Sequence, residues 1–426
     1  MYDYLPKKRI LFVEQWPGIG GAITNVLYPM ITNLDRNRYE PFVLFYWPHP
    51  YVEKFEALGI KTMVFADSKE WEHVGVVNEL QKNNWVKTLQ ADNGLSSAVY
   101  HAVGSYVRLG YYLPQIMQLV KIIRANKIDL VHLNSDPTRH GREVIIAAKL
   151  AGAKTLCYAQ NFSEFQAVDR QIARLIDRYV FCSKAIGRHC ISSGGATPDQ
   201  GCTIYPGVPD TEKWSQARDR TKIRREFGWS DQDFVLGNIG RLVSWKGQHI
   251  FLEALAEVKQ HVPDVKGLIV GGPLETSTGQ NGQSPTYPTY YEELLALIKA
   301  LDLESNVKFA GFRSDIPEIL ASVDVFVHSS SEPEPFATAV IEALMAGCPV
   351  IATNAGGMPE MIANAQTGML CDINNPKSMA QAMLIYYYSQ TQTQRIAKAG
   401  QQRATQHLTA QRHINEFHNL YRSIWV

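Results

Sequence analysis

Two glutamates, Glu334 and Glu342, are separated by seven residues within the segment 331–349, SEPEPFATAVIEALMAGCP. The prolines predict a loop around Glu334, and the run ATAVIEALMA predicts a helix that contains Glu342. Three residues between them contribute backbone N–H groups without intrahelical partners, and these are Phe336, Ala337 and Thr338. A helix start of this kind attracts phosphate through its free donors and its dipole. A carboxylate on either side suits hydroxyl groups that flank a diphosphate, so the segment predicts a nucleotide-sugar site.

A second segment, residues 240–247 with the sequence GRLVSWKG, follows the apolar run FVLGNI. We expect that run to be a strand, which places Gly240, Arg241 and Lys246 just beyond its carboxyl end. Fixed cations at such a position stabilise the charge that develops on a departing phosphate, and two of them can take the place of Mg²⁺. Taken alone, the two side chains are equally compatible with ordinary surface charges. In register with the Glu334 segment, they predict a diphosphate site that needs no metal.

A third segment, residues 16–22 with the sequence WPGIGGA, follows the first predicted strand. Gly20 and Gly21 let the backbone approach a ligand where a side chain would clash. A plain turn between a strand and a helix is the alternative interpretation. A dinucleotide-binding G-x-G-x-x-G fingerprint is excluded, because Ile23 stands at its third glycine position.

Together these segments resemble glycosyltransferase family 4, a group of retaining enzymes with the GT-B fold and an E-x7-E hallmark. The resemblance implies that Glu334 contacts hydroxyls of the donor sugar and that Glu342 contacts the ribose of the nucleotide. It also implies that Arg241 and Lys246 hold the diphosphate, so Arg241, Lys246 and Glu334 form the predicted catalytic set. The family often has glycine where this chain has Ala337, and the added methyl group would narrow the sugar pocket.

Weaker matches extend the resemblance along the chain. In the family, a loop like that of Gly20 and Gly21 meets the donor phosphate or the acceptor. The segment 309–315, FAGFRSD, resembles the pattern F-x-G-x-x-x-D, where backbone near Phe312 and Arg313 would face the base. The predicted donor-binding residues are Gly20, Gly21, Gly240, Phe312, Arg313, Phe336, Ala337, Thr338 and Glu342.

The acceptor side departs from the family pattern. Many members carry a histidine after the strand that here reads TLCYA, but this chain has Gln160 and Asn161 there. Either amide can make the same hydrogen bond, although neither can carry a charge. Asn134 and Asp136 follow another predicted strand, where an acceptor could bind. These four residues are the candidates for the acceptor side.

The resemblance implies a retaining, metal-independent glycosyltransferase that moves a sugar, expected to be a hexose, from a nucleotide sugar to a saccharide or glycolipid acceptor. The co-substrate would be a UDP- or GDP-sugar, with no further cofactor. The leaving phosphate oxygen would help to deprotonate the acceptor, so no protein nucleophile is required. Two alternatives remain open: a nucleotide-sugar epimerase of the same architecture, and a non-catalytic protein that binds sugar nucleotides. A nicotinamide dehydrogenase is disfavoured by Ile23.

Short β-branched runs alternate with longer helical patterns, which is typical of βαβ units and parallel sheets. The predicted strands form two series, at residues 9–15, 40–46, 61–65, 130–133, 155–159 and 178–182, and at residues 234–239, 266–270, 307–310, 323–328 and 349–352. Two series predict an α/β protein with two doubly wound, Rossmann-like domains. The resemblance implies the GT-B architecture, in which the two domains face a cleft.

Pro206, Gly207 and Pro209 interrupt both patterns between the two series, which indicates a domain boundary. We therefore expect an acceptor-binding domain over residues 1–210 and a donor-binding domain over residues 211–406. Apolar residues at helical spacing in 407–426 predict a last helix, which in the family packs back on the N-terminal domain.

Two other segments carry readable patterns. Residues 113–126 predict an amphipathic helix packed on the first sheet, with a membrane-surface helix as the minority interpretation. Residues 275–289 are rich in Gly, Ser, Thr, Gln and Pro, which predicts a loop.

The composition of the 426 residues fits a globular protein with a large core, since 45% are hydrophobic and 19% are charged. A net charge of +1 provides no overall field that would attract nucleic acid, so no nucleic-acid partner is expected. The six cysteines form no C-x-x-C pair and are interpreted as small buried side chains. The N-terminal sequence lacks the pattern of a signal peptide, and no apolar run is long enough to span a bilayer. We expect a cytoplasmic protein, with a peripheral contact at the inner face of the membrane left open.

Overall fold

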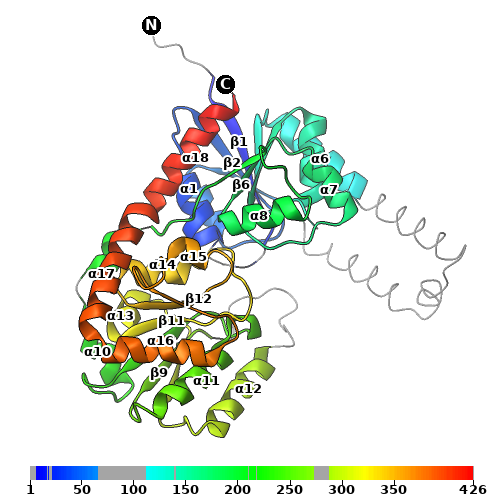
Figure 1. Cartoon of the computed structure of the whole chain (residues 1–426). Helices are drawn as coiled ribbons and strands as arrows, with labels where there is room; N and C mark the ends of the chain where they lie inside the picture. The colour runs from blue at the N-terminus through cyan, green and yellow to red at the C-terminus, as the bar shows by residue number, and fades with distance from the viewer. Residues whose placement is uncertain are drawn as a thin grey trace, which may run out of the picture. The chain divides into compact units, whose positions relative to one another are not determined.

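The computed structural model describes residues 6–16, 18, 22–65, 112–138, 141–209, 211–216, 218–272 and 287–425. Contacts within the chain divide it into two compact units. The first unit comprises residues 1–19, 34–181 and 188–202, and the second comprises residues 20–33, 182–187 and 203–426. Each unit is built around one sheet (Figure 1).

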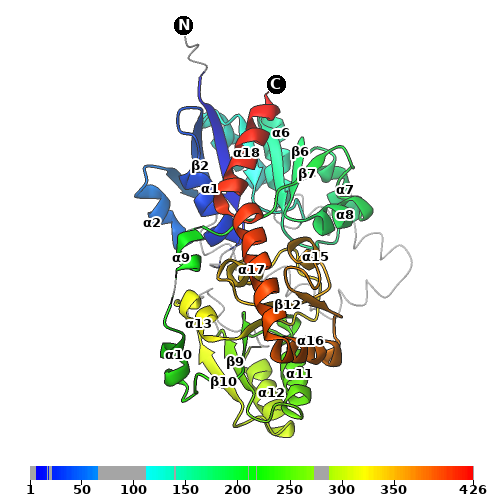
Figure 2. The ribbon, with the colours of Figure 1, turned by 60° about the vertical axis from the view of Figure 1, so that its left-hand side comes forward.

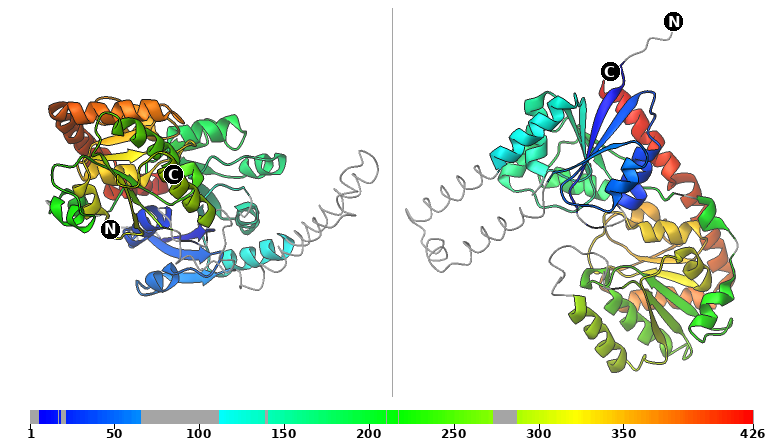
Figure 3. Two further views of the ribbon diagram at one scale, coloured as in Figure 1. Left: turned by 90° about the horizontal axis from the view of Figure 1, so that it is seen from below. Right: turned by 180° about the vertical axis from the view of Figure 1, so that it is seen from behind.

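The first sheet has seven strands in the order β3-β2-β1-β4-β5-β6-β7. Their bounds are β1 Lys8–Glu14, β2 Tyr39–Phe45, β3 Lys61–Val64, β4 Leu130–Leu133, β5 Lys154–Ala159, β6 Arg178–Phe181 and β7 Gly201–Thr203. The pairs with a described register, from β3 across to β6, are parallel. The blue strands of this sheet lie side by side in the rear view of Figure 3.

The second sheet has six strands in the order β10-β9-β8-β11-β12-β13, again with parallel pairs. Their bounds are β8 Val235–Ile239, β9 Lys266–Val270, β10 Val307–Gly311, β11 Val325–His328, β12 Val350–Thr353 and β13 Met369–Cys371. Numbered within the sheet, this order is 3-2-1-4-5-6, which is the order of the Rossmann fold. The first sheet has the same order with one strand added at its edge.

Helices flank both sheets, as parallel strands joined by crossovers require. In the first half of the chain they are the π-helix η1 Ala22–Leu27, α1 Tyr28–Thr32, α2 Tyr51–Glu56, a helix over residues 112–125, α6 Arg142–Ala151, α7 Ala167–Ala173 and α8 Lys184–Ser192. In the second half they are α9 Thr211–Ser215, α10 Arg220–Glu226, the 3₁₀ helix η4 Ser244–Lys246, α11 Gln248–Lys259, α12 Tyr287–Ala300, α13 Ile316–Ser322, α14 Thr338–Met345, α15 Met358–Met361, α16 Pro376–Tyr388, α17 Gln390–His407 and α18 Ala410–Ile424.

The second sheet is covered on both faces by separate apolar clusters. One cluster joins buried side chains of α11, α12 and α16 to the sheet, with Phe251, Leu294 and Met383 among them. The other joins α10, α13 and α14, with Ile223 and Leu344 among them. Two covered faces explain why these strands are apolar without alternation, and they define a doubly wound domain.

All eleven predicted strands are present, with bounds that differ from the prediction by at most two residues. The sequence-based prediction missed the three-residue strands β7 and β13, which lie at sheet edges and contain too few residues for a period to be recognised. The predicted fold class, an α/β protein with two doubly wound, Rossmann-like domains, is therefore confirmed.

Two predicted helices also bury the faces that the pattern indicated. Residues 112–125 are helical, with Ile116, Leu119 and Ile123 buried and Met117 exposed on the other side. At the C-terminus, α17 extends to His407 and α18 begins at Ala410, so the predicted 407–426 helix is the separate helix α18 (Figure 2). Its apolar face is buried, and the Tyr421 hydroxyl lies 3.6 Å from the sulfur of Met30 in α1.

Glycine is required where two segments cross at the predicted boundary. The amide of Val208 donates to the Leu408 carbonyl at 3.1 Å, and the amide of Ala410 donates to the Val208 carbonyl at 3.1 Å. A Cβ atom on Gly207 would lie 2.2 Å from the carbonyl carbon of Thr409. Only glycine allows this approach. The domain boundaries at residues 210 and 406 stay a prediction.

Two expectations need correction. Five of the six cysteines are buried, but Cys202 is exposed, because it lies in the edge strand β7. Most of the predicted loop 275–289 lies outside the described residues, and its last three residues already belong to α12, where Pro288 occupies the first turn.

Candidate functional site

The strand order of the second sheet reverses between β8 and β11, which are paired in parallel. Ligands of doubly wound sheets bind at the carboxyl ends of the strands that flank such a switch point. The predicted segment 240–247 follows β8, and the predicted segment 331–349 begins three residues after β11. The fold therefore brings both segments to one edge of the sheet.

The loop after β8 is fastened to the loop after β11 through the backbone. The amide of Ser331 donates to the Trp245 carbonyl at 2.9 Å, and the Ser329 hydroxyl donates to the Lys246 carbonyl at 3.2 Å. Gly247 has φ of 67°, and a Cβ atom there would lie 2.0 Å from the Ser329 carbonyl oxygen. Glycine is thus required both for the conformation and for the contact.

This attachment places Lys246 against Glu334. The Lys246 ammonium donates to Oε2 of Glu334 at 2.7 Å, and the Glu334 side chain is only 7% exposed. The other carboxylate oxygen, Oε1, lies 2.7 Å from Nε2 of His328 and also accepts from the Ser330 hydroxyl. Burial disfavours ionisation of Glu334, but His328 and Lys246 outweigh this effect and hold its pKa well below the ordinary value. The carboxylate is therefore ionised and fully hydrogen-bonded.

Two glycines contact the backbone of Glu334. The Gly357 amide donates to the Glu334 carbonyl at 2.8 Å. Gly356 has φ of 61°, and a Cβ atom on it would lie 2.0 Å from that same carbonyl oxygen. Close packing on a pair of glycines keeps the loop in one conformation, as a residue with a defined role at a ligand site requires.

Arg241 lies at the same edge of the sheet and is exposed. Its guanidinium lies 5.5 Å from the Trp245 ring centroid, and the Lys246 ammonium lies 4.5 Å from the same centroid. One aromatic ring thus supports both predicted cations. The buried Gln248 donates to the Arg241 carbonyl at 2.9 Å, which fixes the backbone of this turn.

The helix predicted in 331–349 is α14, and Ala337 is its N-cap with φ of −83° and ψ of 112°. Thr338 is the first helical residue, so its amide has no intrahelical partner. The extended conformation of Ala337 suits any residue, and alanine is therefore accommodated without strain. Phe336 precedes the helix and stacks on Tyr205, with ring centroids 5.3 Å apart.

Glu342 lies one turn into α14 and is largely buried. Burial raises the pKa of Glu342 to about 7, although the charge of Lys213 and a hydrogen bond with Asn25 oppose the rise. Glu342 and Glu334 therefore differ in charge state near neutrality, the first being partly protonated and the second ionised.

The segment after β10 presents one exposed and one fully engaged side chain. Phe312 is 79% exposed. The Arg313 guanidinium forms ion pairs with Asp315 at 2.7 Å and with Glu226 at 2.5 Å. The amide of Gly271 donates to the Gly311 carbonyl at 2.9 Å, so the glycines at the ends of β9 and β10 meet next to Phe312. Backbone is accessible here, whereas the Arg313 charge is already neutralised. Gly240 lies beside this point and donates from its amide to the Val270 carbonyl at 2.9 Å.

The predicted acceptor-side residues gather at the switch point of the first sheet, between β1 and β4. The Asn134 amide donates to Oε2 of Glu14 at 2.6 Å, and the Gln160 amide donates to Oδ1 of Asn134 at 2.9 Å. Burial raises the pKa of Glu14, although hydrogen bonds from Trp16 and Asn134 oppose the rise. Glu14, Asn134 and Gln160 thus form a chain of hydrogen-bonded side chains, and none of them forms an ion pair within the described part of the chain.

The two other acceptor-side candidates differ from each other. Asp136 is buried and accepts from the hydroxyls of Ser163, at 2.6 Å, and Thr138. Asn161 is exposed. Gly20 and Gly21 lie outside the described residues.

A buried carboxyl that the sequence-based prediction missed lies in α6. Oε1 of Glu143 accepts from the Tyr46 hydroxyl at 2.7 Å, and its Oε2 is buried without a hydrogen-bond partner among the described residues. Burial raises the pKa of Glu143 to about 7. Its position on a helix face gave it the pattern of an ordinary N-terminal acid, so only the tertiary structure identifies it.

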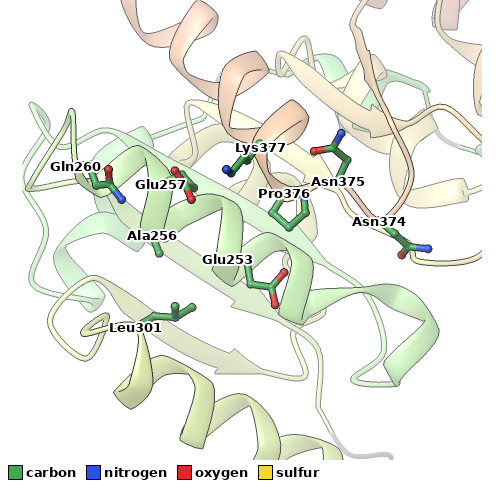
Figure 4. Close-up of a pocket in the computed structure, with 9 residues that line it drawn as sticks. All are labelled: Glu253, Ala256, Glu257, Gln260, Leu301, Asn374, Asn375, Pro376 and Lys377. Carbon is green, nitrogen blue, oxygen red and sulfur yellow. The ribbon is translucent and has the colours of Figure 1, made fainter.

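Two cavities of the second unit lie at or near the described site. One of about 470 Å³ lies between α11 and the start of α16 and is lined by Glu253, Glu257 and Lys377, among others (Figure 4). Another of about 310 Å³ borders the segment 240–247 at Ser244 and includes His249 and Tyr290. The Tyr290 hydroxyl donates to Gln248, so this second cavity adjoins the support of Arg241.

Within the described ranges, no group of three or more His, Cys, Asp or Glu side chains is arranged to hold a metal ion. In the same part of the chain, no helix combines the length and apolar character needed to cross a bilayer.

The architecture of two Rossmann-like sheets is that of the GT-B glycosyltransferases, and solved structures agree with it. Anabaena Alr3699/HepE in complex with UDP and glucose aligns with a TM-score of 0.74 and 26% identity, over 98% of this chain and 100% of the other. A glycosyltransferase from Rickettsia africae ESF-5 aligns with a TM-score of 0.78 over 99% of both chains, at 19% identity.

Residues 219–403 match the sequence model of the family described as Glycosyl transferases group 1. This part of the chain is therefore similar to that family. Spore coat protein SA of Bacillus subtilis (strain 168) is 30% identical over 254 residues, which are 58% of this chain and 65% of the relative. The UDP-Gal:alpha-D-GlcNAc-diphosphoundecaprenol alpha-1,3-galactosyltransferase of Escherichia coli is 27% identical over 64% of this chain and 70% of the relative. The match thus spans less than two thirds of the first of these relatives.

Several residues of the site carried no recognisable motif. His328 and Ser330 follow an apolar run, and a polar side chain at a strand end was the one feature that could have drawn attention to them. Trp245 and Gln248 lie within or beside the predicted cation segment. Their roles depend on contacts with Arg241 and Lys246 that a linear pattern does not contain.

Proposed function

We propose that this chain is a retaining glycosyltransferase of family 4 that moves a hexose from a nucleotide sugar to a hydroxyl group of a saccharide or lipid-linked acceptor. The observation that carries the proposal is the convergence of Lys246, Arg241 and Glu334 at the switch point between β8 and β11. A carboxylate beside two supported cations suits a ligand that joins a sugar to a diphosphate. The chemistry of the named relatives, which includes UDP and UDP-sugar ligands, supports the same class of donor.

In the proposed reaction, the bond between the anomeric carbon of the sugar and the diphosphate oxygen breaks, and a bond to the acceptor oxygen forms on the same face. The acceptor proton goes to the departing phosphate oxygen. Arg241 and Lys246 stabilise the negative charge that develops on the diphosphate. Glu334 orients the sugar through its hydroxyls, Glu342 binds the ribose, and the amide of Thr338 faces a phosphate. Protein cations perform the neutralisation that a metal ion performs in other transferases, so we propose that no metal is needed.

The acceptor is proposed to bind at the first sheet, where Asn134, Asp136 and Gln160 present hydrogen-bonding groups. We also propose a cytoplasmic location, where nucleotide sugars are available, with a lipid-linked acceptor reached at the inner face of the membrane.

The test is a panel of UDP-, GDP- and ADP-sugars, assayed for release of the nucleoside diphosphate with and without saccharide and lipid-linked acceptors, in EDTA and in Mg²⁺. We expect acceptor-dependent release that EDTA does not reduce, and a product whose anomeric configuration by NMR matches that of the donor. Conversion of the donor sugar without any acceptor would instead identify an epimerase. Donor binding without release would identify a non-catalytic binding protein, and strict dependence on Mg²⁺ would contradict the role given to the two cations.

A further inference from the structure

We propose that Glu334 neutralises Lys246 in the donor-free site, and that His328 is a positioning residue that holds Glu334 in place once a donor diphosphate has taken Lys246 from it. This inference rests on the proposed function, because it describes how the same side chains exchange partners when the donor arrives. It assigns a role to each oxygen of the Glu334 carboxylate.

Lys246 already has an anionic partner in this structure. Its ammonium lies 2.7 Å from Oε2 of Glu334, and the two side chains are only 19% and 7% exposed. A lysine in such a pair is not available to a second anion without a loss, since charge pairs screened from water interact strongly. A diphosphate that binds at this point must therefore compete with Glu334 for Lys246.

Such an exchange would cost Glu334 its charge partner. Removing one partner from a buried ion pair leaves an uncompensated charge, which is strongly unfavourable. Glu334 would then become protonated or move, and in either case it would lose the geometry needed to contact a sugar. The exchange is tolerable only if other donors remain on the carboxylate after Lys246 leaves.

His328 and Ser330 are these donors. Both approach Oε1, the oxygen that Lys246 does not contact, His328 from 2.7 Å. His328 is the last residue of β11, so its position is set by the strand rather than by the loop that carries Lys246. Oε1 is thus the anchored oxygen, and Oε2 is the oxygen that can exchange an ammonium for a sugar hydroxyl.

The tautomer of His328 follows from its surroundings. Its Nδ1 is buried and has no hydrogen-bond partner among the described residues, so a proton there would be an unsatisfied buried donor. The proton therefore belongs on Nε2, where it is donated to Glu334.

Two variants of His328 form a matched pair, because both are amides of similar polarity. The nitrogen of glutamine in His328→Gln can occupy the place of Nε2, whereas the nitrogen of asparagine in His328→Asn can reach only the place of Nδ1. With the nucleotide sugar that the wild type turns over, we expect His328→Gln to retain most of the turnover number. We expect His328→Asn to lose at least about tenfold, which is the effect of one hydrogen bond to a buried charge. Thermal unfolding of both variants checks that the fold is kept.

The binding of UDP, which has the diphosphate and the ribose but not the transferred sugar, separates positioning from a structural role. By isothermal calorimetry we expect the UDP affinity of His328→Asn to stay within about twofold of the wild type, because the loss concerns the sugar contact. Equal loss of turnover in His328→Gln and His328→Asn, or a fall in UDP affinity that parallels the fall in turnover, would overturn the positioning role.

The competition for Lys246 has its own test in Glu334→Gln. This change keeps the shape of the side chain but removes its negative charge, so Lys246 becomes available to the diphosphate. We expect UDP to bind at least several-fold more tightly than to the wild type, while turnover of the nucleotide sugar is lost. Unchanged or weaker UDP binding in Glu334→Gln would refute the competition. A wild-type protein that binds neither UDP, GDP nor ADP would refute the proposed function itself, which keeps the two failures apart.

Discussion

The two sheets of this protein have the same strand order, but their switch points carry different chemistry. Between β8 and β11 the side chains are charged and paired: Lys246 with Glu334, and Arg241 free of ion pairs among the described residues. Between β1 and β4 they form hydrogen bonds instead, from Gln160 to Asn134 and from Asn134 to Glu14, whose pKa is raised by burial. One topology thus provides two places for a ligand, and the residues at the strand ends decide its charge.

The difference teaches that the fold specifies where chemistry occurs and not which chemistry it is. Fixed cations suit a diphosphate, whereas amides and a hydrogen-bonded carboxyl group suit neutral hydroxyl groups. The proposed assignment of the donor to the second sheet and of the acceptor to the first depends on this contrast. Four predictions test it.

The largest effect is expected from Lys246→Ala, which removes a cation from the charged switch point. Turnover should fall by about a hundredfold or more, because one contact to developing charge commonly contributes about 3 kcal/mol. Steady-state kinetics measure the loss, and circular dichroism checks the fold. Lys246→Arg, which keeps the charge, is the matched control and should recover part of the activity. Near-normal turnover of Lys246→Ala would remove the basis of the contrast.

A smaller effect is expected in the dependence of stability on pH. Each unit contains a carboxyl whose pKa is raised to about 7 by burial, and these are Glu143 in the first unit and Glu342 in the second. The native state holds these protons more tightly than the unfolded chain does. Their contribution is therefore complete below about pH 4.5 and is lost as the pH rises towards 7. Each should contribute a decline of about 3 kcal/mol in the free energy of unfolding.

Urea denaturation of the wild type, Glu143→Gln and Glu342→Gln between pH 4.5 and 8 tests this expectation. Each glutamine variant should show a flatter dependence on pH than the wild type, since it has one titrating group fewer. Parallel curves for all three proteins would show that neither carboxyl titrates in this range.

The third test removes one member of the hydrogen-bonded chain at the first switch point. Asn134→Ala breaks its hydrogen bonds with Glu14 and Gln160, so we expect the KM for the acceptor to rise by about tenfold. The KM for the donor should not change, which is the control within the same experiment. A rise in both constants would indicate that Asn134 does not belong to a separate acceptor region.

The smallest effect is expected from salt. Raising the ionic strength from about 0.05 to 0.5 M should weaken UDP binding several-fold, because screening reduces attraction between exposed charges. The KM for a neutral saccharide acceptor should stay nearly constant over the same range. If salt affected both equally, the two switch points would not differ in charge as described.

Much of this organisation was predictable because it depends on residues that are close together in the sequence. Apolar runs of four to seven residues marked eleven strands, since parallel strands buried on both faces need them. The segments around Arg241, Lys246 and Glu334 were recognisable as a candidate diphosphate site, because such a site needs cations at a strand end and free amides at a helix start. By contrast, β7 and β13 have three residues each, too few for any period to be recognised.

The sequence by itself determined the fold class, the two series of strands and the residue types offered at each strand end, because these depend on neighbours along the chain. The tertiary structure alone decided that Lys246 pairs with Glu334 across 88 positions of sequence, that His328 holds the other oxygen, and that Gly247 and Gly356 allow the loops to touch. It also decided which carboxyls are buried, and hence that Glu334 is ionised while Glu143 and Glu342 titrate near neutrality. Charge state depends on burial and on distant partners, and no local pattern contains either.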